Sequence, residues 1–499
     1  MARYGATMLT RLVARGFKNL DVEVRLGPFT CIAGPNGVGK SNVFDVIAFL
    51  SALAGKPLLE AALDVRGGAG RMGDTRGIFR RVGTTTAADP ISLSADMIIP
   101  LRGEDQLGQV AEASITYLRY ELELRYRAEL PARPNGGIEI LRESLNHLNL
   151  SDARTFLGFP YSPSFRDSCI KGRRTTPYVS TDKDGFVLLH ADSKGGKGGG
   201  APRKVRARDL PRTVLSTAEN AAEHRTATLA RREMLSWTEL HLEPSALRAP
   251  DDFTAPSTIG HNGAHLPATL YRLARQERGE MAPEADAPVY ARVANRLSQL
   301  IEQVRSVGVD VDEKRQLLSI VMTDRNGTPH LASSLSDGTL RFLALAVMSE
   351  EAHPRALLCL EEPENGMHPS RIPAMLNLLQ DLAVDPDESV GPDNPLRQVI
   401  INTHSPSVVA HVPDDSLLMA KLVPGLENAE LAVLLPLQHT WRGGDEAVVK
   451  GDLLAYLDPI GPRGVGPGDR PLNISKAGRR VKDREDLQET FDFETRAAE

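Results

Sequence analysis

A glycine-rich octapeptide restricts the fold of this chain more than any other feature of its 499 residues. It follows a short apolar run, Pro28–Ala33, and precedes Lys40–Ala54, where apolar residues recur at helical spacing. Strand, glycine loop and helix in this order are typical of a phosphate-binding loop, because glycines let backbone N–H groups approach the anion and the helix N-terminus favours negative charge. The loop consists of Gly34, Pro35, Asn36, Gly37, Val38, Gly39, Lys40 and Ser41.

The last two residues of this loop indicate the ligand. In the pattern G-x-x-x-x-G-K-[ST] the lysine, here Lys40, reaches the β- and γ-phosphates of a nucleotide, and the hydroxyl of Ser41 is a ligand of Mg²⁺. A glycine loop that arose by chance would have no reason to lie between a strand and a helix. The sequence therefore predicts an α/β fold that binds ATP with Mg²⁺.

A second apolar run, Ala356–Leu360, ends in two adjacent carboxylates, Glu361 and Glu362. Consecutive strand residues point to opposite sides, so the two acids serve different purposes. We expect Glu361 to bear on the Mg²⁺ shell and Glu362 to polarise the attacking water as a general base. Taken alone, the pair would be read as solvated acids at a strand end; beside a phosphate loop it indicates an ATPase.

Two further segments fit the same ligand. Ser336 and Gly338 open a helical pattern, where a hydroxyl and free N–H groups form an anion site. A third apolar run, Val399–Asn402, leads into His404, which can contact a γ-phosphate. A plain helix cap and a structural histidine are the ordinary interpretations of these residues taken singly, but the order of the motifs along the chain favours the nucleotide.

In this order the motifs resemble those of the soluble ABC-type ATPases of the SMC, RecF and OLD class. The acidic block looks like that of compact AAA family ATPases without a TOPRIM nuclease, many of which resemble components of prokaryotic anti-phage systems. The resemblance covers residues 8–125 and 235–435. It is carried by Gly16–Leu20 with the phosphate loop, Leu335–Thr339, Glu361–Pro369 and Asn402–Pro406.

The resemblance implies a P-loop NTPase fold of the ABC-ATPase head type: a mixed sheet with flanking helices, an antiparallel β subdomain, and an insertion of helices and loops. It implies a homodimer that closes on ATP, with the phosphate loop and His404 of one copy facing Ser336 and Gly338 of the other. Two residues depart from the family pattern, because Glu361 stands where Asp is usual and Asp337 where transporters have Gly. No Q-loop glutamine is assigned: Gln106 and Gln109 are available, but neither has a convincing context.

We expect four parts along the chain. Alternating residues from 88 to 129 predict antiparallel strands, and helical spacing returns at Thr217–Ser236 and Pro288–Val304. The expected parts are 1–125, the first half of the ATPase head with the phosphate loop; 126–300, an insertion of helices and a basic flexible loop; 301–440, the second half of the head; and 441–499, a C-terminal extension with a mobile end.

The partners are less well defined by the sequence. The formal net charge is −6, which excludes a global positive field, but residues 171–212 hold eleven Lys and Arg against four Asp around a glycine-rich loop. Such a stretch suits DNA phosphates, and it is equally compatible with a solvated insertion. The acidic pairs Asp414-Asp415 and Asp445-Glu446 are interpreted as chance surface pairs rather than as a nuclease centre.

Three functions remain open at this point. The favoured one is an ATPase of anti-phage defence that dimerises around ATP and couples nucleotide state to DNA, or to an effector protein such as a nuclease or toxin. The alternatives are a RecF-like ATPase of DNA repair, and a slow-turnover scaffold or sensor that sequesters an effector. A transporter subunit does not fit, because the insertion between the phosphate loop and Leu335–Thr339 is too long.

The cysteines and the apolar runs indicate the compartment. Cys31, Cys169 and Cys359 form neither a disulfide framework nor a zinc spacing, so a reducing cytoplasm is expected. No run approaches the roughly 18 apolar residues of a membrane span, and we expect no membrane insertion.

Overall fold

The computed structural model describes residues 7–65, 74–82, 85–86, 89–105, 107–128, 136–192, 203–278, 288–351, 356–425, 429–444 and 446–457. Contacts divide the chain into residues 1–457 and 458–499. The second unit lies outside the described residues, and so does the C-terminal end that we expected to be mobile.

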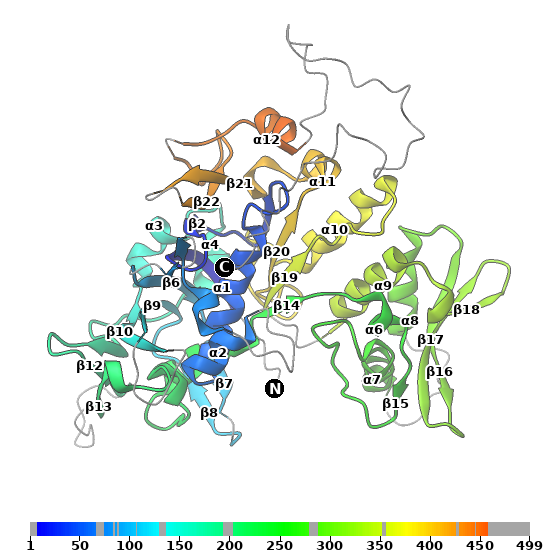
Figure 1. Cartoon of the computed structure of the whole chain (residues 1–499). Coiled ribbons are helices and arrows are strands. Elements are labelled where there is room, and N and C mark those ends of the chain that lie inside the picture. The colour runs from blue at the N-terminus through cyan, green and yellow to red at the C-terminus, as the bar shows by residue number, and fades with distance from the viewer. Residues whose placement is uncertain are drawn as a thin grey trace, which may run out of the picture. The chain divides into compact units, whose positions relative to one another are not determined.

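A six-stranded sheet carries the predicted motifs (Figure 1). Its first five strands in space are parallel to their neighbours, and only the last pair is antiparallel. The carboxyl ends of the parallel strands therefore lie along one edge of the sheet. In spatial order the strands are β14 (Thr238–Leu240), β19 (Leu357–Glu361), β20 (Gln398–Thr403), β3 (Phe29–Ala33), β21 (Leu417–Pro424) and β22 (Glu430–Pro436).

Both faces of this sheet are buried, which explains why its strands read as continuous apolar runs. Alternate residues point to opposite faces, so Ile32 and Cys359 pack in one apolar cluster with helix α1, while Cys31 and Leu358 pack in another with helices α9 and α10. These helices are α1 (Lys40–Leu53), α9 (Asp337–Ser349) and α10 (Ile372–Leu382).

An eight-stranded antiparallel sheet packs beside α1, as the alternating residues predicted. Its strands are, in spatial order, β13 (Arg203–Arg206), β12 (Phe186–Leu189), β11 (Val179–Thr181), β10 (Gly137–His147), β9 (Tyr117–Arg127), β6 (Ile91–Ile98), β1 (Met8–Arg15) and β2 (Asp21–Arg25). Two short hairpins accompany it, β4 (Arg81–Val82) with β5 (Thr85–Thr86) and β7 (Arg102–Glu104) with β8 (Val110–Glu112).

We expected residues 126–300 to be an insertion of helices and a flexible loop. The structure corrects this expectation, because the eight-stranded sheet continues through β10 to β13 in this region. The strands β11 to β13 have only three or four residues each, too few for a clear alternation in the sequence. The boundaries of the four parts stay a prediction.

A smaller group of helices and strands follows β14 in the sequence. Helices α6 (Pro244–Arg248), α7 (Leu266–Arg278) and α8 (Pro288–Ser298) pack with α9 and with the strands β15 (Asp251–Asp252), β16 (Val304–Asp312), β17 (Leu317–Asp324) and β18 (Pro329–Leu331). The remaining helices include α2 (Leu58–Asp64), α3 (Ala153–Leu157), α4 (Pro163–Cys169), α5 (Arg225–Ser236), α11 (Pro406–His411) and α12 (Lys450–Leu457).

Two expected helices are shorter than their patterns. Helix α5 begins at Arg225 rather than near Thr217, and the distant Asp192 carboxylate accepts the backbone N–H of Thr226 in its first turn at 2.6 Å. Val304 starts a strand instead of ending α8. All three cysteines are buried and free. None of the helices in the described part of the chain combines the length and the hydropathy of a membrane span.

Candidate functional site

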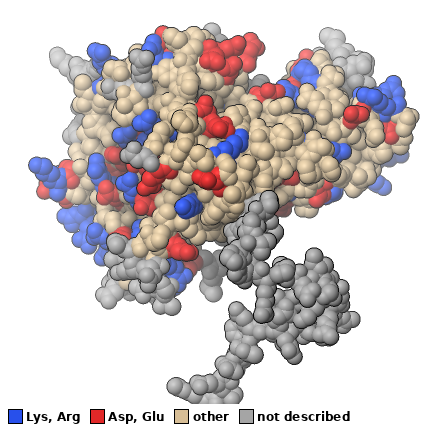
Figure 2. All heavy atoms as spheres, turned by 90° about the horizontal axis from the view of Figure 1, so that it is seen from above, with Lys and Arg blue, Asp and Glu red and all other residues tan. Residues whose placement is uncertain are grey.

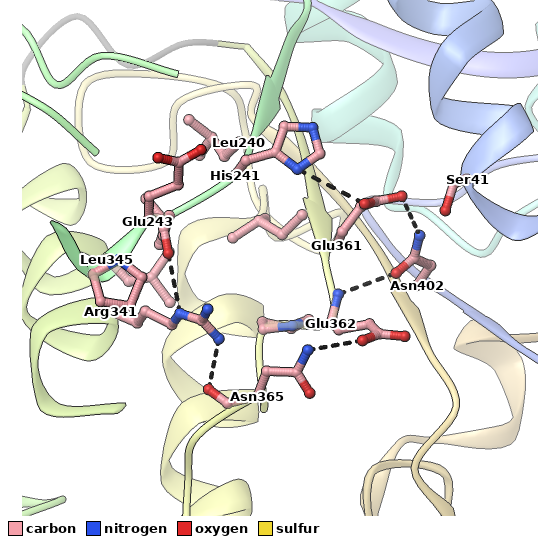
Figure 3. Close-up of a pocket in the computed structure, with 14 residues that line it drawn as sticks. Ser41, Leu240, His241, Glu243, Arg341, Leu345, Glu361, Glu362, Asn365 and Asn402 are labelled. Atoms are coloured by element: carbon pink, nitrogen blue, oxygen red, sulfur yellow. Dashed lines mark hydrogen bonds and ion pairs between the residues drawn. The ribbon is translucent and has the colours of Figure 1, made fainter. Parts of the chain in front are cut away.

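The candidate site lies where four parallel strands end. The register places Glu361 of β19 beside Asn402 of β20, and Asn402 beside Ile32 of β3. The phosphate loop, which follows β3, therefore lies on the same edge as the two acids and His404. A hollow of about 360 Å³ opens there, and Ser41, Glu361, Glu362 and Asn402 are among the residues that line it (Figure 3).

The conformation of the phosphate loop depends on its glycines. Gly39, which directly precedes α1, has φ of 100°, a left-handed conformation that side chains rarely adopt. A Cβ on Gly34 would lie 2.7 Å from the carbonyl oxygen of Ala420 on the neighbouring strand β21. Any larger residue at these two positions would move the loop away from the start of α1, where its N–H groups are directed at an anion.

Lys40 folds back over this loop. Its ammonium donates to the carbonyl oxygens of Gly34 at 2.7 Å and Pro35 at 2.8 Å, and the residue is only 6% exposed. Burial lowers the pKa of Lys40, and the nearby carboxylates of Glu362 and Glu361 oppose this shift. The side chain is thus a positive charge held at the mouth of the loop, close to the acidic strand end.

Glu362 is held in a constrained geometry by its backbone conformation and its hydrogen bonds. Its φ is 43°, a left-handed conformation that costs a residue with a side chain roughly 1–2 kcal/mol. Its N–H donates to the backbone oxygen of Asn402 at 3.1 Å and to the Asn402 side-chain oxygen at 3.0 Å. The carboxylate accepts from His404 Nδ1 at 2.6 Å and from Asn365 Nδ2 at 2.7 Å.

These bonds keep Glu362 ionised. Burial raises the pKa of its carboxyl, but the hydrogen bonds from Asn365 and His404 and the nearby positive charges outweigh burial, so the pKa lies below its usual value. His404, 42 residues further along the chain, is brought to Glu362 by the parallel pairing of β19 and β20. The two predicted catalytic side chains are therefore direct partners.

The two carboxylate oxygens of Glu361 have different partners. Its Oε1 accepts from Asn402 Nδ2 at 3.3 Å, and its Oε2 lies 3.7 Å from Nδ1 of His241. Ser41 lines the same hollow from the start of α1, as Figure 3 shows. A hydroxyl and a carboxylate converging on one hollow are oxygen ligands of the kind that Mg²⁺ prefers, so the residues present fit this ion.

Ser336 and Gly338 are not among the residues that line this hollow. Ser336 is exposed and its hydroxyl caps α9, accepting from the N–H of Thr339 at 3.3 Å. Gly338 is buried, and a Cβ there would lie 2.9 Å from the carbonyl oxygen of Gly366. The glycine therefore lets the start of α9 pack closely on the segment that follows the acidic strand.

A protein-family model described as "AAA domain, putative AbiEii toxin, Type IV TA system" matches residues 29–100 and 199–410. The two ranges contain the whole phosphate loop, the acidic strand end and His404, and together they cover more than half of the chain. The chain belongs to this AAA family. With the sheet topology, this match confirms the predicted resemblance and the α/β P-loop NTPase fold of the ABC-ATPase head type.

Two other comparisons give more distant likenesses. Over 62 residues the chain is 40% identical to structural maintenance of chromosomes protein 4 of Mus musculus and of Homo sapiens, which is 12% of this chain and 5% of each relative. An SMC head bound to the C-winged helix domain of ScpA shares 13% identity and a TM-score of 0.45, over 86% of this chain and 98% of that one. The SMC head domain from Thermotoga maritima shares 12% identity and a TM-score of 0.36, over 86% of this chain and 99% of that one.

The AAA domain also contains site residues that we did not single out in the sequence. Glu239 and His241 lie at the end of β14. His241 lines the hollow together with Asn402, Asn365 and Arg341, whereas Glu239 is not among the lining residues. The alternation Thr238-Glu239-Leu240-His241-Leu242 was a signal for the first two, because it puts both polar side chains on one side of a strand. Gln109 is not among the residues that line the hollow, and Gln106 lies outside the described residues.

The basic stretch, residues 171–212, is only partly exposed. Arg174 donates to the carbonyl oxygens of Thr176 and Ala191 and lies 4.0 Å from the ring centre of Tyr178, so its role is structural. Lys204 pairs with Asp182 at 2.8 Å. Lys194 and Lys197 lie outside the described residues. The exposed members are Lys171, Arg173, Lys183, Arg203, Lys204, Arg206 and Arg208.

Figure 2 shows Lys and Arg gathered at the left margin of one face.

Of the acidic pairs, Asp414 is bound to Lys450 at 2.9 Å, and Asp445 lies outside the described residues.

Proposed function

We propose that this chain binds ATP with Mg²⁺ and hydrolyses it, as a homodimer in which two copies enclose the nucleotide. The observation that carries the proposal is the meeting of Lys40 and Ser41 with Glu361, Glu362 and His404 at one edge of the sheet. More than 300 residues separate the two groups in the sequence, and the parallel strands bring them together.

The phosphate loop and Lys40 bind the phosphates. The ammonium is held by two carbonyl oxygens of the loop itself, so it can turn from these carbonyls to the phosphate oxygens of a bound nucleotide. The Ser41 hydroxyl and Glu361 would hold Mg²⁺. When bound, this ion neutralises the charge that develops on the phosphates.

Hydrolysis falls to Glu362. An ionised carboxylate can accept a proton from water, and its low pKa favours the ionised form at neutral pH. Asn365 and His404 each hold one of its oxygens, so its orientation is fixed before the nucleotide arrives. Because His404 is 41% exposed at its side chain, it can also reach a phosphate at the open side of the site.

The dimer is supported by the position of Ser336 and Gly338. They open helix α9, where N–H groups are available to an anion, yet they do not belong to the hollow of their own chain. A second copy can bring them to the phosphates. Ser336 is exposed and therefore available for this contact.

We assign the ATPase to anti-phage defence, where nucleotide state controls an effector protein such as a nuclease or toxin. The family description, which names a toxin and a type IV toxin–antitoxin system, supports this assignment. DNA contact through residues 171–212 is a second candidate, and the exposed Arg203, Arg206 and Arg208 favour it. The alternative reason for those charges is structural, since β13 is the edge of its sheet and charged residues on an edge strand prevent unwanted pairing. A repair ATPase and a slow scaffold remain the alternatives for the whole chain.

Nucleotide binding and phosphate release by Lys40→Ala test the proposal. The variant should bind a fluorescent ATP analogue at least about 100-fold more weakly and release no phosphate above background. Lys56→Ala is the matched control, because Lys56 lies just after α1 and is half-exposed in a pair with Asp64 at 2.5 Å. Wild-type turnover in the Lys40 variant would contradict the proposed site.

A further inference from the structure

Three potential metal ligands converge beside the proposed nucleotide site. One ligand atom from each of Glu239, His241 and Glu361 lies within 4.8 Å of the other two. His241 Nε2 is 3.2 Å from a carboxylate oxygen of Glu239, and His241 Nδ1 is 3.7 Å from Oε2 of Glu361. Figure 3 shows His241 at the end of β14, directed at the Glu361 carboxylate.

The backbone explains why these side chains meet. Glu239 and His241 are two residues apart at the end of a strand, so they share one face. Parallel pairing of β14 with β19 sets Leu240 beside Leu360, which puts His241 next to Glu361. Glu239 and Glu361 belong to strands of the central sheet, and His241 directly follows β14, so the sheet positions the cluster, which favours a site with defined geometry.

Glu361 connects this cluster to the nucleotide. Its Oε1 is on the side of Asn402 and Ser41, while its Oε2 is on the side of His241. Ser41 and His241 line the same hollow. One carboxylate can therefore serve two cations, one through each oxygen, as bridging carboxylates do in two-metal sites.

We propose that Glu239, His241 and Glu361 bind a second divalent cation of the transition-metal class, such as Mn²⁺, next to the Mg²⁺ of the proposed nucleotide site. Mg²⁺ prefers oxygen ligands alone, whereas an imidazole nitrogen with two carboxylates suits Mn²⁺ or Zn²⁺. The side chain of His241 is 45% exposed and that of Glu361 28%, so water can complete the coordination shell.

An alternative accounts for the same contacts without a metal. A protonated His241 would bind both carboxylates as an ion pair, and the hydrogen bond to Glu239 together with the neighbouring acids does raise the pKa of this histidine. The ion pair and the metal exclude each other, because the ring needs a free nitrogen for the metal. The two explanations therefore predict opposite results when metal is added.

The test is a titration of the nucleotide-free full chain with Mn²⁺, followed by electron paramagnetic resonance of the unbound ion. The wild type should hold one Mn²⁺, and both His241→Ala and Glu239→Gln should raise its Kd at least about tenfold. His330→Ala is the matched control, because His330 also pairs with an acid, Asp324, at 3.2 Å and is similarly exposed. An unchanged Kd in both site variants, or no binding by the wild type, would overturn the proposal in favour of the ion pair.

Lys40→Ala separates this inference from the proposed function. Lys40 is not a ligand of the cluster, so the variant should lose nucleotide binding and keep the Mn²⁺ site. Since His241 is on the surface, its replacement should leave the far-ultraviolet circular dichroism spectrum unchanged. His241→Asn, which removes the imidazole but keeps a polar side chain, should weaken Mn²⁺ as His241→Ala does.

Discussion

Asn402 offers a sharp test of how the site is held, because one buried side chain positions both acids. It is 1% exposed, its oxygen accepts the N–H of Glu362 at 3.0 Å, and its amide donates to Glu361 at 3.3 Å. Asn402→Ala removes both bonds. The N–H of Glu362 keeps the backbone oxygen of residue 402 at 3.1 Å, so no buried donor is left without a partner.

We therefore expect Asn402→Ala to lose a moderate amount of stability and a larger share of its activity. One neutral bond and one long bond to a carboxylate together contribute about 2 kcal/mol to the free energy of unfolding. Glu362 holds a left-handed conformation that it would otherwise leave, and a shift of its carboxylate by about 1 Å costs roughly 100-fold in kcat. Nucleotide affinity should change less than about threefold, since the hydrogen bonds of the Asn402 side chain go to Glu361 and Glu362 rather than to Lys40 or the phosphate loop.

Urea unfolding, phosphate release and nucleotide binding measure these three quantities. Asn146→Ala is the matched control: Asn146 also donates to a carboxylate, that of Glu121, but in the eight-stranded sheet. It should lose stability without losing kcat. The reasoning is refuted if Asn402→Ala loses the expected stability and keeps kcat within about threefold of the wild type, because Glu362 would then hold its position without this side chain.

Two further predictions concern buried positions. Burial raises the pKa of Glu143 from 4.5 to about 7. Between these pH values the native state keeps a proton that the unfolded chain releases. The contribution of Glu143 to stability therefore falls as the pH rises through that window. Urea unfolding of Glu143→Gln should therefore show the variant gaining up to about 3 kcal/mol relative to the wild type between pH 4.5 and 7; an unchanged difference would contradict the assigned pKa. Gly338→Ala places a methyl group 2.9 Å from the Gly366 carbonyl and should destabilise the chain by about 1–3 kcal/mol in thermal unfolding, whereas Gly308→Ala, where a Cβ meets nothing within 4 Å, serves as the control and should differ far less.

The phosphate loop and the three apolar strands could be predicted because each signal is local. Strands buried on both faces are continuous apolar runs, and the glycine spacing in Gly34–Ser41 allows few alternatives. That His404 and Glu362 would lie at one edge also follows from parallel strands. Their direct hydrogen bond does not, because it depends on the positive φ of Glu362.

The parts that escaped prediction depend on distant partners. The alternation around β14 puts Glu239 and His241 on one side of a strand, but it does not say which strand lies beside them. Their position next to Glu361 follows only from the pairing of β14 with β19. The start of α5 is fixed by Asp192, more than 30 residues away. The charged strand β13 resembles a loop in the sequence, since both of its faces carry basic residues.

The most direct test of the account combines Glu362→Gln with ATP and Mg²⁺ and records molecular mass by sedimentation alongside phosphate release. The variant keeps the size and polarity of Glu362 but cannot act as a general base, so phosphate release should fall at least about 100-fold. ATP should shift the variant from monomer to a persistent dimer, whereas the wild type should return to its starting state as ATP is consumed. Wild-type turnover by the variant, or a mass that ATP changes in neither protein, would contradict the central claim that this chain encloses and hydrolyses ATP between two copies.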